Sequence, residues 1–132
     1  MKNDKTDNHE QIFWEEIDRL FPDMIKAIAS LSKKSYLSIT NLRTGITWWS
    51  ERAMDYFGMK ENYTIRGMEK ANRKIHPDDV ATFKRGFKER VDGKNLDTAW
   101  EYRIQDGDSY NRFNAMARVL YDEQKQPFII II

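Results

Sequence analysis

The chain has 132 residues, and its 22 Lys and Arg residues against 21 Asp and Glu residues give a net charge of +1. This length supplies one hydrophobic core and therefore one domain, and the balanced charge argues against a dedicated nucleic-acid-binding protein. Cysteine is absent, which excludes disulfides and thiol nucleophiles and fits a cytoplasmic location. The sequence also has no apolar stretch long enough to predict a membrane span or a signal peptide.

The N-terminal third begins with a polar lead, residues 1–9, for which we predict disorder. Over residues 10–33 the apolar side chains recur at spacings of three and four, which predicts an amphipathic helix. Pro22 removes one backbone hydrogen bond, so this helix is expected to kink or restart there. The apolar seam fits either packing on the sheet of the same domain or dimerisation, and the sequence leaves both open. In the second case the chain forms a homodimer through Phe13, Ile17, Leu20, Met24 and Leu31.

A strand hairpin followed by a short helix is predicted next. The side chains of residues 35–42 alternate between two faces, which predicts a strand, and the β-branched and aromatic residues 46–49 suit a second strand. Ser50 can then cap a helix, and Gly58 suits its left-handed end. Residues 62–71 are weakly periodic and predict short helices with irregular joints.

The segment Ile75-His76-Pro77-Asp78-Asp79 is typical of a helix start. Proline belongs at the first helical position, and the two aspartates interact favourably with the helix dipole. His76 is then the cap, and the helix is expected to run to about Val91. A metal site at His76, Asp78 and Asp79 is the alternative, but each residue already has a capping role, so we predict no metal site.

Three strands are predicted in the C-terminal third. Residues 97–105 and 109–121 flank the turn at Asp106-Gly107, and in both segments the side chains alternate between two faces of a strand. Residues 128–132 are apolar. An apolar strand that stops at the last residue is unusual, and it suggests that the chain is a fragment of a longer protein.

The order of these elements, together with several short motifs, resembles the PAS family, in particular its subgroup with a Trp-Ser strand end. The matching segments are Thr47-Trp48-Trp49-Ser50, Ala53, Tyr56-Phe57-Gly58, Ile75-His76-Pro77-Asp78-Asp79, Glu101-Tyr102-Arg103-Ile104 and Asp106-Gly107. The resemblance covers the chain from about residue 35 and implies a PAS domain over residues 34–132. It implies an α+β fold, with a five-stranded antiparallel sheet in the order 2-1-5-4-3 and helices on one face. The amphipathic helix at residues 10–33 is then an addition outside the core fold.

The resemblance also implies a function. Members of the family sense small molecules, light or redox state and pass the signal to an attached output domain. We therefore expect this chain to be the regulatory sensor of a bacterial signalling protein, which binds a small molecule in its cavity and relays the signal to a C-terminal output domain. The first candidate for that output domain is a diguanylate cyclase. The alternatives are a ligand-free dimerisation module and the sensor of a histidine kinase. An enzyme is disfavoured because the carboxylates fall mostly on helix starts, turns and polar helix faces.

The candidate cavity-wall residues are mostly aromatic: Trp49, Phe57, Ile75, Phe83, Tyr102, Phe113 and Ala115. Each of them also fits an ordinary core position, which is the commoner use of such side chains. The sequence identifies no cofactor. The light-sensing subgroups that form a covalent bond need a cysteine, and haem-binding members use a histidine on the long helix, whereas His9 and His76 lie elsewhere. Flavin held without a covalent bond stays open.

Overall fold

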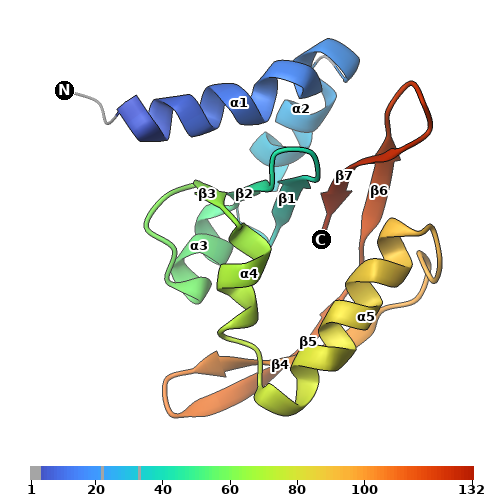
Figure 1. Cartoon of the computed structure of the whole chain (residues 1–132). Coiled ribbons are helices and arrows are strands. Elements are labelled where there is room, and N and C mark those ends of the chain that lie inside the picture. Colours follow the sequence, from blue (N-terminus) through green and yellow to red (C-terminus); the bar gives the residue numbers. More distant parts are fainter. Residues whose placement is uncertain (1–3, 22, 33) are drawn as a thin grey trace. The chain divides into compact units, whose positions relative to one another are not determined.

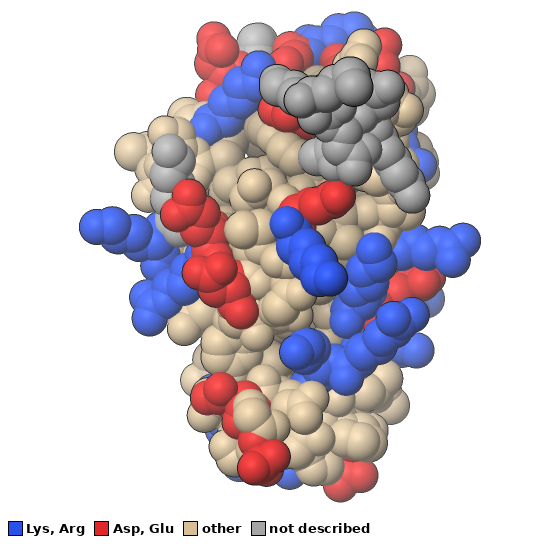
Figure 2. All heavy atoms as spheres, turned by 90° about the vertical axis from the view of Figure 1, so that its left-hand side faces the viewer, with Lys and Arg blue, Asp and Glu red and all other residues tan. Residues whose placement is uncertain are grey.

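The computed structural model describes residues 4–21, 23–32 and 34–132, and it divides into two compact units, Met1–Gly67 and Met68–Ile132. Figure 1 labels the helices and strands of both units. Side chains of both charge signs occur on the face that Figure 2 shows, as the nearly equal totals lead one to expect. Among the described residues, no helix has the length and apolar character needed to cross a membrane.

Two helices open the first unit, α1 (Asp4–Leu20) and α2 (Met24–Leu31). The predicted restart is confirmed, because α1 ends before residue 22 and α2 begins after it; residue 22 itself lies outside the described residues. The predicted disordered lead is helical from Asp4, earlier than the expected start at Glu10, and residues 1–3 lie outside the described part. Residues 2–9 of the lead are polar and so gave no periodic signal, although polar residues can extend a helix that is already nucleated.

The first unit contains a three-stranded antiparallel sheet in the order β3-β2-β1, formed by β1 (Ser38–Asn41), β2 (Ile46–Trp49) and β3 (Tyr63–Ile65). The hairpin of β1 and β2 was predicted. Strand β3 was not, and the short helices expected over residues 62–71 reduce to α4 (Gly67–Asn72). Three residues are too few for an alternating pattern to be recognised, so β3 is specified by its pairing with β2 rather than by its own sequence.

Helix α3 (Glu51–Phe57) has both of its predicted caps. The hydroxyl oxygen of Ser50 accepts a hydrogen bond from the Ala53 backbone N–H at 3.2 Å. Gly58 adopts the left-handed conformation, with φ of 68°, and its N–H reaches back to the carbonyl of Asp55. These short-range interactions follow directly from residue type, which is why the sequence predicted them.

Helix α1 packs against β2 and β3 of its own unit. Phe13 and Ile17 are fully buried. The indole N–H of Trp14 donates to the Tyr63 hydroxyl at 2.7 Å, and the side-chain amide of Asn41 donates to the Phe13 carbonyl at 3.3 Å. The sequence left two roles open for the apolar seam, packing on the sheet of the same domain and dimerisation. The N-terminal half of the seam, on α1, therefore packs on the sheet of its own domain.

The second unit contains the 3-10 turn η1 (Pro77–Asp79), helix α5 (Val80–Val91) and four strands. The strands are β4 (Trp100–Asp106), β5 (Ser109–Ala115), β6 (Arg118–Tyr121) and β7 (Pro127–Ile131). They form two antiparallel pairs, β4 with β5 and β6 with β7. The single strand predicted over residues 109–121 is interrupted at Met116 and Ala117, between β5 and β6. The alternation of side chains continues through this break, so the pattern could not reveal it.

The strand neighbours that the order 2-1-5-4-3 requires within either unit are present. In that order the first strand lies beside the second, the third beside the fourth and the fourth beside the fifth, with β5 and β6 together as the fourth strand. These neighbours are observed as β1 with β2, β4 with β5 and β6 with β7.

Candidate functional site

The predicted helix start at residues 75–79 is locked to strand β4. The ring nitrogen Nδ1 of His76 accepts from the Asp78 backbone N–H at 3.1 Å, which confirms the predicted cap. Asp79 Oδ2 accepts from both the backbone N–H and Nε of Arg103 at 2.8 Å, and Oδ1 accepts from Nη2 at 2.9 Å. The segment before the turn also pairs with β4, through the His76 N–H to the Arg103 carbonyl at 2.9 Å. The carboxylate and this segment together cover backbone groups that an edge strand would leave free.

The Asp79–Arg103 pair makes the stability of the domain depend on pH. The hydrogen bonds from Arg103 lower the pKa of Asp79 from 3.8 to about 2. A carboxyl group whose pKa is lower in the folded state stabilises that state fully above its unfolded pKa, and the contribution is lost as the pH falls through the folded value. We expect Asp79→Asn to be destabilising above about pH 4 and to converge with the wild type near pH 2. Urea unfolding at several pH values measures this difference, and Asp78→Asn, at a carboxylate that is 81% exposed, is the control.

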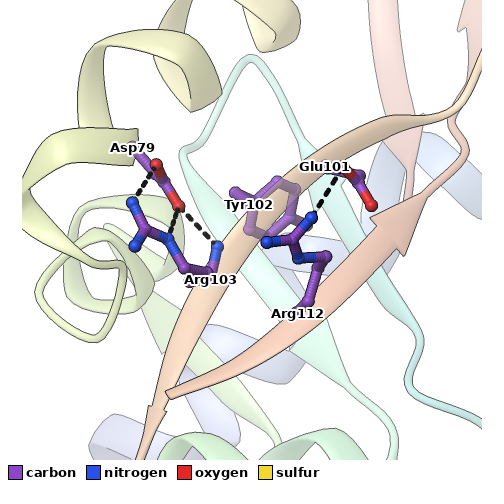
Figure 3. A pocket seen from close by; sticks show the side chains of 5 residues that line it. All are labelled: Asp79, Glu101, Tyr102, Arg103 and Arg112. Atoms are coloured by element: carbon purple, nitrogen blue, oxygen red, sulfur yellow. Dashed lines mark hydrogen bonds and ion pairs between the residues drawn. The ribbon is translucent and has the colours of Figure 1, made fainter.

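A polar pocket of about 360 Å³ lies beside this pair, lined by Asp79, Glu101, Tyr102, Arg103 and Arg112. Figure 3 shows that each arginine faces a carboxylate, and the second pair joins Arg112 Nη1 and Glu101 Oε2 at 3.6 Å. Opposite charges are therefore matched within the lining. Because the charges of the lining residues balance, this pocket has no net attraction for a charged ligand. Of the predicted cavity-wall residues, only Tyr102 is among the residues that line it.

In the first unit, the predicted wall residues Trp49 and Phe57 lie together. Their ring centroids are 5.3 Å apart, with the rings tilted by 43°. Trp49 is 1% exposed, and its indole N–H finds no acceptor among the described residues. A buried donor without a partner costs about 1–3 kcal/mol, so this indole, like Nδ1 of His9, is a buried polar atom that the packing of the first unit leaves without a partner.

In the second unit, the structure brings Phe83 and Tyr102 together with Trp100, which was not on the predicted list. The rings of Phe83 and Tyr102 meet edge to face at 4.8 Å, and Trp100 lies 5.8 Å from Tyr102. Burial raises the pKa of Tyr102, so its hydroxyl is neutral at physiological pH. Phe113 pairs with Tyr102 across the strands, and Ala115 pairs with Trp100. The predicted wall residue Ile75 forms an isolated antiparallel backbone bridge with Ile104 of β4.

Arg90 is the residue of this region that sequence reasoning missed. It lies near the end of α5, it is 2% exposed, and its guanidinium carbon stands 3.9 Å from the centre of the Trp100 ring. An arginine in the last turn of a helix is usually exposed to solvent, where its positive charge interacts favourably with the negative end of the helix dipole. The small residue Gly86, one turn earlier on the same helix, is the signal that an aromatic ring approaches this face.

Gly86→Ala tests this close approach. A Cβ at Gly86 would lie 2.9 Å from two ring atoms of Trp100, closer than normal contact. Glycine to alanine in a helix interior normally stabilises by about 0.8–1 kcal/mol, and overpacking costs about 1–3 kcal/mol. We expect Gly86→Ala to be destabilising by about 1 kcal/mol in urea unfolding. The exposed helix position Lys84→Ala is the control, and a stabilised Gly86→Ala variant would contradict the tight packing of Trp100.

A family model described as the PAS fold matches residues 46–132, which is most of the chain. The chain belongs to the PAS fold family. The predicted membership of the PAS family is therefore confirmed. No protein curated for function matches the sequence.

Two solved structures are similar to this PAS domain. One is a sensory box histidine kinase/response regulator from Burkholderia thailandensis, with a TM-score of 0.57 and 18% identity over 81% of this chain and 79% of that chain. The other is the N-terminal domain of a diguanylate cyclase with PAS/PAC sensor from Marinobacter aquaeolei, with a TM-score of 0.56 and 15% identity over 72% of this chain and 87% of that chain. At these identities the likeness concerns the fold, and the predicted PAS-like fold class is confirmed.

The ionisable groups that line the polar pocket are engaged with one another. Within the described part of the chain, no three His, Asp or Glu side chains are grouped so that they could hold a metal ion. Several buried N–H groups that lack an acceptor among the described residues lie instead on or beside aromatic rings.

Proposed function

We propose that this PAS domain is the sensor of a bacterial signalling protein and that it binds a small molecule against its buried aromatic residues. The observation that carries the proposal is that buried N–H donors in each unit, Trp49 Nε1 in the first and Trp100 Nε1 and Arg90 Nε in the second, find no acceptor among the described residues. The large majority of buried side-chain polar atoms are paired in folded proteins. Three of them beside aromatic rings, in a domain of a sensory family, favour an acceptor that comes from a bound molecule.

The seven predicted wall residues remain candidates for this site. In the second unit the favoured ones are Phe83 and Tyr102, because they are buried, in ring contact and next to two of the unpaired donors. Phe113 and Ala115 lie on β5 opposite Tyr102 and Trp100, and both are half-buried. In the first unit the candidates are Trp49 and Phe57.

Observing the indole N–H signals by NMR tests the proposal, because the chain has four tryptophans. Molecules released from the purified, denatured protein are identified by mass spectrometry and added back, and a visible spectrum reports any flavin. We expect the Trp49 or Trp100 signal to shift on binding. The Trp14 indole, already bonded to Tyr63, is the internal control. If nothing co-purifies and no compound of a metabolite library moves either signal, the domain is a ligand-free interaction module instead.

We further propose that the domain controls a diguanylate cyclase on the same polypeptide, with a histidine kinase as the second candidate. The support is the likeness to sensor domains whose own names mention these two activities. The full-length protein should convert GTP into the cyclic dinucleotide if the first proposal holds, and it should phosphorylate itself from ATP if the second holds. A full-length protein with neither activity would overturn both.

We also propose that the protein is a homodimer formed through the N-terminal helices. Phe13 and Ile17 of the predicted interface are fully buried within their own unit. Met24 and Leu31 of α2 are 42% and 87% exposed, and Leu20 is half-buried. The proposed contact therefore lies on α2, where Met24 and Leu31 are two turns apart on one helix face.

Sedimentation equilibrium of the whole chain tests the dimer. Met24→Glu and Leu31→Glu should each weaken self-association, because a carboxylate in an apolar interface loses its hydration. Lys26→Glu, a charge change at another exposed position of α2, is the matched control. A monomeric wild type would overturn the proposal. Deleting residues 1–33 is a poor test, because it also removes the buried Phe13 and Ile17.

A further inference from the structure

The guanidinium of Arg90 is buried against helix α5 and strand β4. Its Nη1 donates to the Gly86 carbonyl at 3.1 Å, and its Nη2 donates to the Thr98 carbonyl at 2.6 Å. Its plane covers the Trp100 ring, with 3.9 Å between the guanidinium carbon and the ring centre. The residue is therefore held in one orientation by two hydrogen bonds and a cation–π contact, and the orientation of its remaining donor is fixed as well.

The positive charge of Arg90 is incompletely balanced. Two carbonyl oxygens accept hydrogen bonds from it but carry no net charge. The nearest carboxylate is that of Glu89, whose Oε2 lies 3.8 Å from Nη1, beyond hydrogen-bond distance, and this side chain is 35% exposed. An arginine is always charged, and a buried charge needs a partner that also provides hydrogen bonds. The charge of Arg90 is therefore met only by this long ion pair with a partly exposed carboxylate.

Two unpaired donors lie at this point of the fold. Arg90 Nε and Trp100 Nε1 are both fully buried and find no acceptor among the described residues. They belong to one cluster, because a Cβ placed on Gly86 would be 2.9 Å from Trp100 Nε1 and 3.2 Å from Arg90 Nη1. Both side chains are at least nine-tenths buried, with exposures of 2% and 8%. Both donors of this cluster lack an acceptor, and a carboxylate has two acceptor atoms and one negative charge.

We propose that Arg90 and Trp100 bind the carboxylate of a small organic acid, and that this is how the sensor recognises its ligand. The inference rests on the proposed function and adds the chemical class of the molecule. A carboxylate matches the site because it brings one charge and two oxygens, and a guanidinium is the usual partner for it. A phosphate, with about two charges and three acceptor oxygens, would exceed the one charge and two donors available. The neighbouring rings of Phe83 and Tyr102 suit an apolar or aromatic body on the acid.

The test follows the Trp100 indole N–H by NMR during titrations of the whole chain with sodium acetate and sodium benzoate. The signal is assigned from its absence in Trp100→Phe. Benzamide, which has the shape of benzoate without the charge, and sodium chloride and phosphate at equal ionic strength are the controls. We expect a saturable shift with at least one carboxylate and a much weaker response to benzamide. No saturable shift with either carboxylate, or an equal response to benzamide, chloride or phosphate, would overturn the inference.

Variants then assign the role of the arginine. Arg90→Lys keeps the charge but loses Nε and the planar stacking, and we expect carboxylate affinity to fall at least about tenfold. Arg85→Lys is the same change at an exposed position of α5 and should leave the affinity unaltered. Unaltered affinity in Arg90→Lys would overturn the role of Arg90. The wild-type titrations stand alone if that variant fails to fold. A co-purified neutral molecule that shifts the Trp100 signal, when neither carboxylate does, would sink this inference and leave the proposed sensor function standing.

Discussion

Replacing Gly67 with alanine should destabilise the PAS domain by about 2 kcal/mol or more. Gly67 begins α4 and is buried, and a Cβ at this position would lie 2.5 Å from Cβ and 2.6 Å from Oγ1 of Thr47 on strand β2. Thr47 cannot move aside, because it is fully buried and its hydroxyl shares a 2.9 Å hydrogen bond with Thr40. Overpacking of this kind costs about 1–3 kcal/mol and occasionally more. Urea unfolding followed by circular dichroism gives the difference.

The sign of this effect is informative, since alanine is otherwise the better helix former by about 0.8–1 kcal/mol. Glu69→Ala, at an exposed position of the same helix, is the matched control and should change stability by less than about 0.5 kcal/mol. If Gly67→Ala proved neutral or stabilising, Gly67 would not lie against Thr47 as closely as the structure has it.

The parts of the fold that the sequence predicted are those that depend on neighbouring residues. The caps of α3 at Ser50 and Gly58, and the start of the turn η1 at His76 and Pro77, are set by residues within four positions of the backbone groups concerned. The parts that it did not predict depend on partners distant in sequence. Strand β3 exists through pairing with β2, and the pairing of Asp79 with Arg103 joins residues 24 positions apart.

The candidate site follows the same rule. The predicted residues Phe83 and Tyr102 are in contact. The helical pattern of α5 placed Phe83 on an apolar face, and the alternating pattern of β4 did the same for Tyr102. Arg90 and Trp100 were missed as a pair, because a charged residue near a helix end and an aromatic residue at a strand start have no signal in common. Their contact is visible when α5 and β4 are placed together, with Gly86 providing the space.

Replacing Phe13 with alanine should cost about 3–5 kcal/mol, which is a large share of the 5–15 kcal/mol that stabilises an ordinary domain. The Phe13 ring is fully buried, with the rings of Trp14 and Tyr63 at 5.0 and 5.4 Å. The variant leaves a cavity between α1 and β3, within a helix that the family resemblance placed outside the core. The measurement is again urea unfolding, now followed by tryptophan fluorescence, because Trp14 lies at the altered contact.

Ile12→Ala is the control for this prediction. Ile12 precedes Phe13 on α1 and is 37% exposed, so its truncation removes far less buried surface and should cost under about 1 kcal/mol. Equal, small losses for the two variants would mean that α1 is separate from the domain and free to serve a partner along its whole apolar seam. A large loss confined to Phe13→Ala would make α1 part of the sensor core. Any dimer would then have to form through the exposed residues of α2.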